Sequence, residues 1–259
     1  MGAPVAELVT YEPIGTFVSA LKYPAEAGHQ PDSNHPLAHV ELFSGRNFEQ
    51  ALKGLEHFSH IWIVFQFHHN KDWKPLVTTP RGGTEKYGVF ATRAPYRPNN
   101  IGMSLVKLAR IEGLKIFVEG ADILDGSPIL DIKPYLVDVE CVPDASSGWP
   151  RSQSYQIDIS QTCEEQLRWL EEKGLQGLRS FLLHQLEYEP TNHKKKRLEQ
   201  REDESFVIAY RTWRVHFSVM GDTVYLLNIF SGYTQAELND PTDLYKDKDL
   251  HRLFMSTKD

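Results

Sequence analysis

Two clusters of polar side chains, each next to an apolar strand-like run, have the chemistry of a ligand-binding pocket. The first contains Arg93, Arg97 and Asn99, and the second is the segment Asp125-Gly126-Ser127. An arginine offers a planar fork of five donors, and Asp-Gly and Pro-Asn turns bring backbone amides close to a ligand. Because binding groups usually lie on loops at the ends of rigid strands, these segments predict a polar pocket on a β scaffold.

The elements that must hold these loops are mostly short strands. Runs rich in Val, Ile, Phe and Tyr, nearly all bounded by turn residues, cover residues 13–21, 38–43, 61–67, 87–92, 103–110, 116–124 and 129–139. One helix interrupts them, with Asn47 as its expected N-cap. Many short strands favour a sandwich or a closed barrel over a parallel wound sheet. The fold class is therefore mainly β, with an α+β part after it.

A change of composition at residues 143–153 predicts a linker between two domains. We expect a β domain over residues 8–145, a smaller α+β domain over 154–233 and a polar tail over 234–259 with one short helix. In the second domain Thr162 and Glu165 fit a capping box. Leucines at 175, 178, 182 and 186 predict a further helix, and Gly221-Asp222 a β-hairpin.

Bulk composition limits the class of protein. The net charge is −7, there are two cysteines, and no apolar run approaches the roughly 20 residues that cross a bilayer. These features predict a cytoplasmic protein with no disulfide framework and no membrane contact. The acidic balance disfavours a protein that coats nucleic acid, but it permits an enzyme that grips one structured RNA through a local basic face. The basic run from Lys194 to Arg197 is either such a face or merely a solvated surface.

Several common catalytic motifs are absent. The chain has no G-x-G-x-x-G turn, no phosphate-binding P-loop and no G-x-S-x-G elbow. His57 and His60 flank a strand, and the adjacent His68 and His69 would point to opposite faces of one. No nearby carboxylate completes a metal site, so we expect no bound metal.

The order of several segments resembles the TrmO family (also called TsaA-like or YaeB-like) of tRNA methyltransferases that use S-adenosylmethionine. The segments are Ile14-Gly15, His29-Gln30-Pro31, Gly54 to Trp62, Phe67-His68-His69, Pro80 to Gly83, Gly88 to Arg93, Arg97 to Val106 and Asp125 to Tyr135. This resemblance implies a closed β-barrel, S-adenosylmethionine as cofactor and a homodimer. It also implies methylation of N6 of threonylcarbamoyladenosine at position 37 of threonine tRNA.

Carried over position by position, the resemblance implies a set of cofactor-binding residues. These are His29, Gln30, Pro31, His68, His69, Arg93, Asp122, Leu124, Asp125, Gly126 and Ser127. The family often has Arg in place of His29 and Gln in place of His69. Its usual Asp-Pro-Arg-Pro segment reads Glu189-Pro190-Thr191-Asn192 here, and the residues Lys194, Lys195, Lys196 and Arg197 could replace the lost charge toward RNA.

Individual roles remain alternatives at this point. Arg93 pairs with a carboxylate of the cofactor or of the threonyl group, or it braces a loop. Asp125 accepts a hydrogen bond from the ligand or caps its own loop.

Arg97 and Asn99 are candidate substrate contacts, although Asn99 could simply hold the Pro98 turn. Asp131 and Tyr135 are weak candidates for a general base.

Arg211 and Trp213 fall on one face of a strand, because side chains alternate between the two faces. They would then meet a phosphate and stack a base. Alternatively Trp213 belongs to the core. Two functions compete with the methyltransferase: a non-catalytic RNA-binding adaptor built on the same barrel, and an S-adenosylmethionine-dependent enzyme with a small-molecule acceptor.

Overall fold

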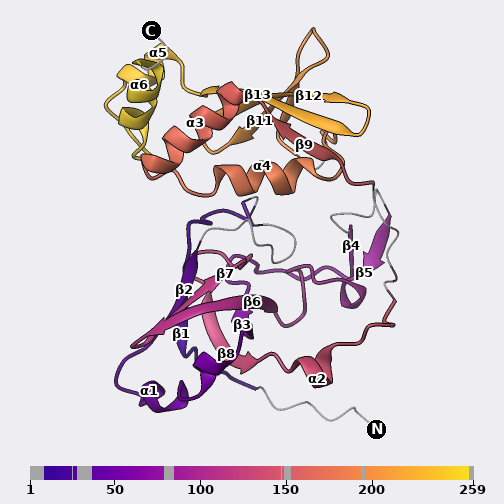
Figure 1. Cartoon of the computed structure of the whole chain (residues 1–259), viewed down its shortest axis with the longest axis vertical. Coiled ribbons are helices and arrows are strands. Elements are labelled where there is room, and N and C mark those ends of the chain that lie inside the picture. The colour runs from indigo at the N-terminus through magenta and orange to yellow at the C-terminus, as the bar shows by residue number, and fades with distance from the viewer. Residues whose placement is uncertain are drawn as a thin grey trace. The chain divides into compact units, whose positions relative to one another are not determined.

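The computed structural model describes residues 9–24, 26–27, 37–78, 85–146, 148, 153–193 and 196–256. They form two compact units, one before residue 149 and one after it (Figure 1). The expected fold class is confirmed, since the first unit is built on a closed β-barrel and the second combines a sheet with helices. No helix among the described residues is long and apolar enough to cross a membrane.

Six antiparallel strands close the barrel in the order β1-β2-β7-β6-β3-β8, and β8 pairs back with β1. The strands are β1 (Gly15–Val18), β2 (Ala38–Leu42), β3 (His60–Gln66), β6 (Ile101–Glu112), β7 (Lys115–Glu119) and β8 (Pro128–Pro134).

Alternation along each strand fills the barrel, as β3 illustrates. Ile61, Ile63 and Phe65 are buried, whereas the residues between them are only partly buried. Because successive side chains of a strand point to opposite faces, one set makes the core and the other makes the outer wall. The core also takes Phe17, Val40, Val106, Ile116, Val118, Ile123 and Ile129.

The barrel unit departs from the expected elements in three places. Residues 87–92 are not one strand, because β5 (Lys86–Gly88), paired with β4 (Leu76–Thr78), gives way to the 3-10 turn η2 (Val89–Ala91). The run 129–139 ends as a strand at Pro134 and is followed by the short helix α2 (Val137–Glu140).

The third departure concerns Asn47, which is the N-cap of the helix as expected but does not cap it through its side chain. It adopts a left-handed conformation with φ 59°, and its side chain makes no capping hydrogen bond. The helix α1 that follows covers only Phe48–Ala51, and the 3-10 turn η1 (Leu55–His57) comes after it.

The C-terminal unit has a five-stranded sheet in the order β10-β11-β12-β13-β9. Its strands are β9 (Gln156–Ile159), β10 (Leu198–Gln200), β11 (Phe206–Tyr210), β12 (Trp213–Met220) and β13 (Thr223–Ser231); its helices are α3 (Gln161–Glu172), α4 (Leu178–Leu186), α5 (Gln235–Asn239) and α6 (Lys248–Ser256). Leucines of α3 and α4 and Phe254 of α6 share one core with Trp213, Val215, Phe217 and Ile229 of the sheet.

Sequence expectations for this unit were partly right. The β12–β13 hairpin turns at Gly221-Asp222, and the leucine run forms α4, as expected. The capping box at Thr162 was wrong, because Ser160 is the N-cap of α3 and accepts from the Cys163 amide at 3.2 Å. The residues after 234, expected as a polar tail, include α5 and α6, and Phe254 is 2% exposed.

Candidate functional site

Barrel topology brings three connections to one end. Strands β1, β3 and β7 finish at the end where β2, β6 and β8 begin, because all neighbours are antiparallel. The connections β1–β2, β3–β6 and β7–β8 therefore share this end. The Asp125 segment and the segment from His68 to Arg97 belong to two of them, so the strand order carries both predicted clusters to the same rim of the barrel.

Asp125 is the anchor of the β7–β8 loop. One carboxylate oxygen accepts from the Ser19 amide at 3.0 Å, and the other lies 2.6 Å from Lys22 Nζ. The Asp125 amide donates to the Leu21 carbonyl at 2.8 Å. The carboxylate therefore locks the β7–β8 loop to the start of the β1–β2 connection, so Asp125 has a structural role at this end of the barrel.

Ser127 and His68 join the β7–β8 loop to the end of β3. The Ser127 hydroxyl and His68 Nδ1 are 3.2 Å apart, and Ser127 is 2% exposed. Gly126, which lies between Asp125 and Ser127 in the sequence, is exposed and has φ 76°, a conformation that favours glycine. A Cβ built there would meet only His68 Nε2 within 4 Å, at 3.9 Å. The turn thus presents its backbone to any ligand beside His68.

The charge state of His68 follows from its surroundings. Burial lowers the pKa of His68 first, and the neighbouring His69 lowers it further, while a backbone hydrogen bond and Asp125 oppose the shift. The imidazole is therefore neutral near pH 7. The rings of His68 and His69 lie 4.1 Å apart in a turn rather than on a strand, so the expectation that they point to opposite faces was wrong.

A second polar contact ties the loop to the barrel interior. The buried Ser104 hydroxyl donates to the Asp122 carboxylate at 2.6 Å. Ser104 lies on β6 between the inward residues Gly102 and Val106. Asp122 is therefore held over the top of the barrel core, at the same rim as Asp125.

The arginine segment has one braced and one free guanidinium. Arg97 donates to the carbonyls of Val89 at 3.1 Å and Thr92 at 2.8 Å, so it holds the η2 turn. Arg93 is exposed and makes no hydrogen bond or ion pair with a described residue. Asn99 is exposed, whereas its neighbour Asn100 donates to the carbonyls of Phe67 and Asn70 and so fixes the turn that carries His68.

The two candidate bases lie along the barrel wall. Strand β8 leaves the rim at Pro128, so at about 3.3 Å per residue Asp131 lies about 10 Å and Tyr135 about 23 Å along it. Asp131 is paired with Lys133 at 2.7 Å, and Tyr135 packs edge-on against Trp62. Their positions give no support to a catalytic role at the rim.

In the C-terminal unit Trp213 belongs to the core, so it was wrong as a base-stacking residue. It is 0% exposed and stacks on His251 at 3.7 Å. Arg211 lies in the turn between β11 and β12 with φ 51°, not on a regular strand, which breaks the alternation on which its pairing with Trp213 depended.

In the basic run, the side chain of Lys196 is hydrogen-bonded to backbone carbonyls, whereas Arg197 is exposed. Lys196 donates to the carbonyls of Gln185, Tyr188 and Glu189, at the C-terminal end of α4. The remaining expected residues, His29, Gln30, Pro31, Lys194 and Lys195, lie outside the described residues.

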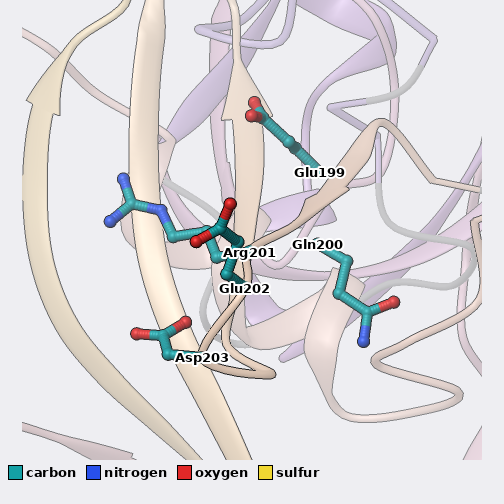
Figure 2. Close-up of a pocket in the computed structure, with 5 residues that line it drawn as sticks. All are labelled: Glu199, Gln200, Arg201, Glu202 and Asp203. Carbon is teal, nitrogen blue, oxygen red and sulfur yellow. The ribbon is translucent and has the colours of Figure 1, made fainter.

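The hollow that Figure 2 shows is lined by the consecutive residues Glu199 to Asp203 of the C-terminal unit. Its side chains point away in different directions, and three of the five are acidic. A surface made by one turn does not enclose a ligand. No group of three or more metal-ligating side chains occurs in the part of the chain that the structure describes.

Sequence reasoning missed the supporting residues Ser19, Lys22 and Ser104. Ser19 and Lys22 meet Asp125 across more than 100 residues of chain. No local sequence motif predicts a contact between residues so far apart in the chain. Ser104 could have been noticed as a polar residue inside an apolar run, which is a signal for a buried hydrogen bond.

Comparison with known proteins adds the family. The family model of the tRNA-methyltransferase O N-terminal domain matches residues 16–141. An Escherichia coli protein named tRNA (adenine(37)-N6)-methyltransferase is 35% identical over 223 residues, which cover 81% of this chain and 91% of that protein. The chain belongs to the tRNA-methyltransferase O family.

Other relatives share parts of this family's sequence. An Eikenella corrodens protein of the same name is 57% identical over 98 residues, covering 36% of this chain and 56% of that protein; the mouse protein is 44% identical over 136 residues, 50% of this chain and 31% of its own length. The chain thus spans about a third to a half of these two relatives. A solved structure of TrmO from Pseudomonas aeruginosa is 27% identical, with a TM-score of 0.64 over 86% of this chain and 99% of that one.

Proposed function

We propose that this protein is an S-adenosylmethionine-dependent methyltransferase that acts on N6 of adenosine 37 in tRNA. The observation that carries the proposal is the meeting of the Asp125–Ser127 loop with His68 at one rim of a barrel of this family. Relatives carry names that support both parts. The E. coli relative is named for the tRNA position, and a Pyrococcus abyssi relative, 38% identical over 152 residues, is named a probable S-adenosyl-L-methionine-binding protein.

The rim has the groups that a nucleoside with an amino acid tail requires. The Gly126 turn exposes backbone amide and carbonyl groups, and Ser127 and His68 add side-chain donors and acceptors. Arg93 is a free guanidinium on the β3–β6 connection, suited to a bidentate contact with a carboxylate. We assign cofactor binding to Asp122, Leu124, Asp125, Gly126, Ser127, His68 and His69, and to Arg93 a carboxylate of either the cofactor or the threonyl group.

Local charge also suits a cationic donor. The negative charge of Asp125 is offset by Lys22, and the lowered pKa of His68 leaves its ring neutral near pH 7, so neither Lys22 nor His68 adds an unbalanced cation beside the Gly126 turn. When bound, S-adenosylmethionine supplies an electrophilic methyl group on a sulfonium. The protein's task is to orient the acceptor nitrogen in line with that group, which in well-aligned reactions contributes roughly 7–11 kcal/mol.

For the acceptor we propose threonylcarbamoyladenosine in threonine tRNA. Its threonyl carboxylate would need a cation, and Arg93 and Arg97 of the β3–β6 connection offer the planar fork that suits a carboxylate. Arg97 is held by the Val89 and Thr92 carbonyls through Nη1, whereas Arg93 has no such contact with a described residue, so Arg93 is the better partner. Arg197 and Arg211 of the C-terminal unit are candidate contacts to the tRNA backbone.

A homodimer is the proposed assembly, and the barrel wall supports it. Exposed apolar side chains lie on β6 and around α2: Ile101, Met103, Leu136, Val137, Val139 and Val142. Contacts make this wall continuous, because Trp62 of β3 donates to Glu140 of α2 and Val64 of β3 pairs with Met103. Monomers rarely expose a contiguous apolar patch of this kind.

Methyl transfer to defined tRNA is the experiment that tests the proposal. Purified protein is incubated with methyl-labelled S-adenosylmethionine and threonine tRNA, either carrying threonylcarbamoyladenosine or transcribed without modification. We expect label in the nucleoside at position 37 only with the modified tRNA. Binding of S-adenosylmethionine without transfer to either tRNA would contradict it in favour of another acceptor, and no binding of the cofactor would favour an adaptor.

A further inference from the structure

The connection between β3 and β6 carries an unusual surface. We call residues 71–78 and 85–99 the aromatic insertion. Three large aromatic side chains on it face solvent: Trp73 is 53% exposed, Phe90 77% and Tyr96 38%. Aromatic rings bury more area than most side chains when they enter a core. Leaving three of them in water within one connection therefore calls for a partner.

The backbone beneath these rings is fixed. Val77 and Val89 are buried, the Val89 amide donates to the Pro75 carbonyl at 3.0 Å, and the Lys74 amide donates to the Tyr96 carbonyl at 3.0 Å. Leu76 pairs with Gly88 in the β4–β5 ladder. These contacts join the backbone segments that carry the three rings, so the segments are held together before any partner arrives.

Cations accompany the rings. Lys74 Nζ lies 4.5 Å from the centre of the Tyr96 ring, and Arg97 Cζ lies 5.8 Å from that of Phe90, while Arg97 is also held by two backbone carbonyls. The insertion has five Lys and Arg side chains against two carboxylates, a net charge of +3 on a chain of −7. None of the five forms an ion pair with a described carboxylate.

Exposed rings flanked by unpaired cations match the chemistry of an unpaired nucleic acid strand. Bases stack on aromatic faces whatever their sequence, and phosphates seek Lys and Arg. A second protein chain fits less well, because the centres of protein interfaces are depleted in lysine. Paired RNA fits less well too, since its bases have no free face to stack.

We infer that the aromatic insertion binds unpaired RNA, stacking bases on its exposed rings and meeting the adjoining phosphates with Lys71, Lys74 and Lys86. The inference rests on the proposed function, in which the target adenosine lies in an unpaired loop beside the anticodon. Beyond that function, it identifies the aromatic insertion as the surface of the barrel unit that holds the nucleotides around the target adenosine.

Equilibrium binding of the full-length protein to two RNA probes tests the inference. The probes are a fluorescent 12-nucleotide single strand with the anticodon-loop sequence and a 12-base-pair duplex, followed by fluorescence anisotropy. Stacking of one base on an aromatic ring is worth about 1–3 kcal/mol by alanine substitution. Trp73→Ala, Phe90→Ala and Tyr96→Ala should each weaken single-strand binding about 5- to 150-fold, with little change for the duplex.

Matched variants separate stacking from loss of fold. Phe90→Trp keeps an aromatic face and should bind like wild type. Leu244→Ala removes a side chain that is 84% exposed in the C-terminal unit and should leave RNA affinity unchanged. Lys71→Ala and Lys86→Ala should each reduce the slope of the log binding constant against the log salt concentration by about 0.7.

Clear results would overturn the inference. Unchanged single-strand affinity in all three alanine variants would reject the RNA surface, and a shift from dimer to monomer with RNA binding intact would assign the rings to self-association. Methyl transfer by wild type is scored separately. Methyl transfer together with RNA binding that does not depend on the three rings would contradict only this inference. RNA binding that depends on the rings, without methyl transfer, would contradict only the proposed methyltransferase function.

Discussion

The carboxylate of Asp125 acts on the rim of the barrel through the backbone of two loops. It accepts from the Ser19 amide and pairs with Lys22, so it fixes the β1–β2 and β7–β8 connections against each other. An exposed ion pair by itself stabilises a fold by only about 0–1 kcal/mol. The value of Asp125 therefore lies in placing Gly126 and Ser127, more than in the stability of the barrel.

Asp125→Ala should weaken binding of S-adenosylmethionine about 10-fold or more, because a lost hydrogen bond to a charged group is worth about 1.5–3 kcal/mol. Thermal unfolding should change little. Calorimetric titration measures the first and a melting curve the second. Glu112→Ala is the matched control, since Glu112 also pairs with an exposed arginine, Arg110, at 2.6 Å. Equal affinities in the two variants would refute the role given to Asp125.

At the residue scale the sequence predicted the segments but not their supports. The Asp-Gly turn and its neighbours could be found because turn residues have local signals. Lys22 and Ser104 could not be assigned, because their contacts depend on strand pairings that bring distant segments together. Of the two alternatives for Trp213, the core position is confirmed. Its pairing with Arg211 was wrong, because Arg211 is left-handed and breaks the alternation on which that pairing relied.

Strand β6 shows how one element sets the position of the His68 turn. It begins beside Phe65 and Phe67, and an added Cβ at Gly102 would lie 2.6 Å and 2.8 Å from their Cζ atoms. The two rings contact each other edge-on at 5.0 Å. Only a residue without a side chain leaves room for these two rings at the point where β3 runs into the turn.

Gly102→Ala should lower the free energy of unfolding by about 1–3 kcal/mol, because overpacking forces ring and backbone shifts. Denaturant unfolding of the purified variant measures this. Gly88→Ala is the control, since a Cβ there meets nothing within 4 Å and its φ of −55° suits alanine. That variant should be neutral or more stable by about 0.4–1 kcal/mol. The idea fails if the two substitutions have the same effect.

Helix α6 is attached to the C-terminal sheet through a buried histidine. His251 is 0% exposed, stacks on Trp213, and lies 2.8 Å from the Ser231 hydroxyl and 3.0 Å from that of Thr212. Burial lowers the pKa of His251 to about 4, and the nearby Asp247 and Asp243 only partly oppose the shift. The ring is therefore neutral at physiological pH and serves as a hydrogen-bonding hub.

Because the unfolded chain binds the His251 proton more tightly than the folded one, the C-terminal unit should lose stability in acid. The contribution is complete above pH 6.5 and is lost as the pH falls towards about 4. At about 1.4 kcal/mol per unit of pKa, the loss is about 3 kcal/mol at most. Urea unfolding at pH 7.5 and 4.5 measures it. His251→Asn should flatten this dependence, whereas the exposed His57→Asn should not; identical pH profiles would contradict the assignment.

At the element scale the strands with clear alternation were predicted well, whereas the exceptions have separate causes. Residues 87–92 are apolar and β-prone, yet η2 forms there because Arg97 and Thr92 take the Val89 carbonyl that a strand would need. The helices after residue 234 were missed as packed elements because one buried aromatic, Phe254, gives too short an apolar pattern.

For the whole molecule, the apolar barrel wall predicts that two copies associate. Met103 is 48% exposed on β6 and Val137 60% exposed on α2. The double variant Met103→Glu with Val137→Glu should convert a dimer into a monomer in light scattering, since charge at the centre of an apolar interface is costly. Met220→Glu, at a residue 64% exposed in the C-terminal unit, is the control. A wild-type monomer, or a dimer that survives both changes, would rule this wall out.

Hydrogen–deuterium exchange of the full-length protein, with and without S-adenosylhomocysteine, tests most directly where the cofactor binds. Exchange should slow on ligand binding in peptides covering residues 67–70 and 120–127. It should not change at residues 199–203, around the hollow of the C-terminal unit. Saturating ligand that leaves both barrel peptides unchanged, or that protects the hollow instead, would contradict a cofactor site at the rim of the barrel.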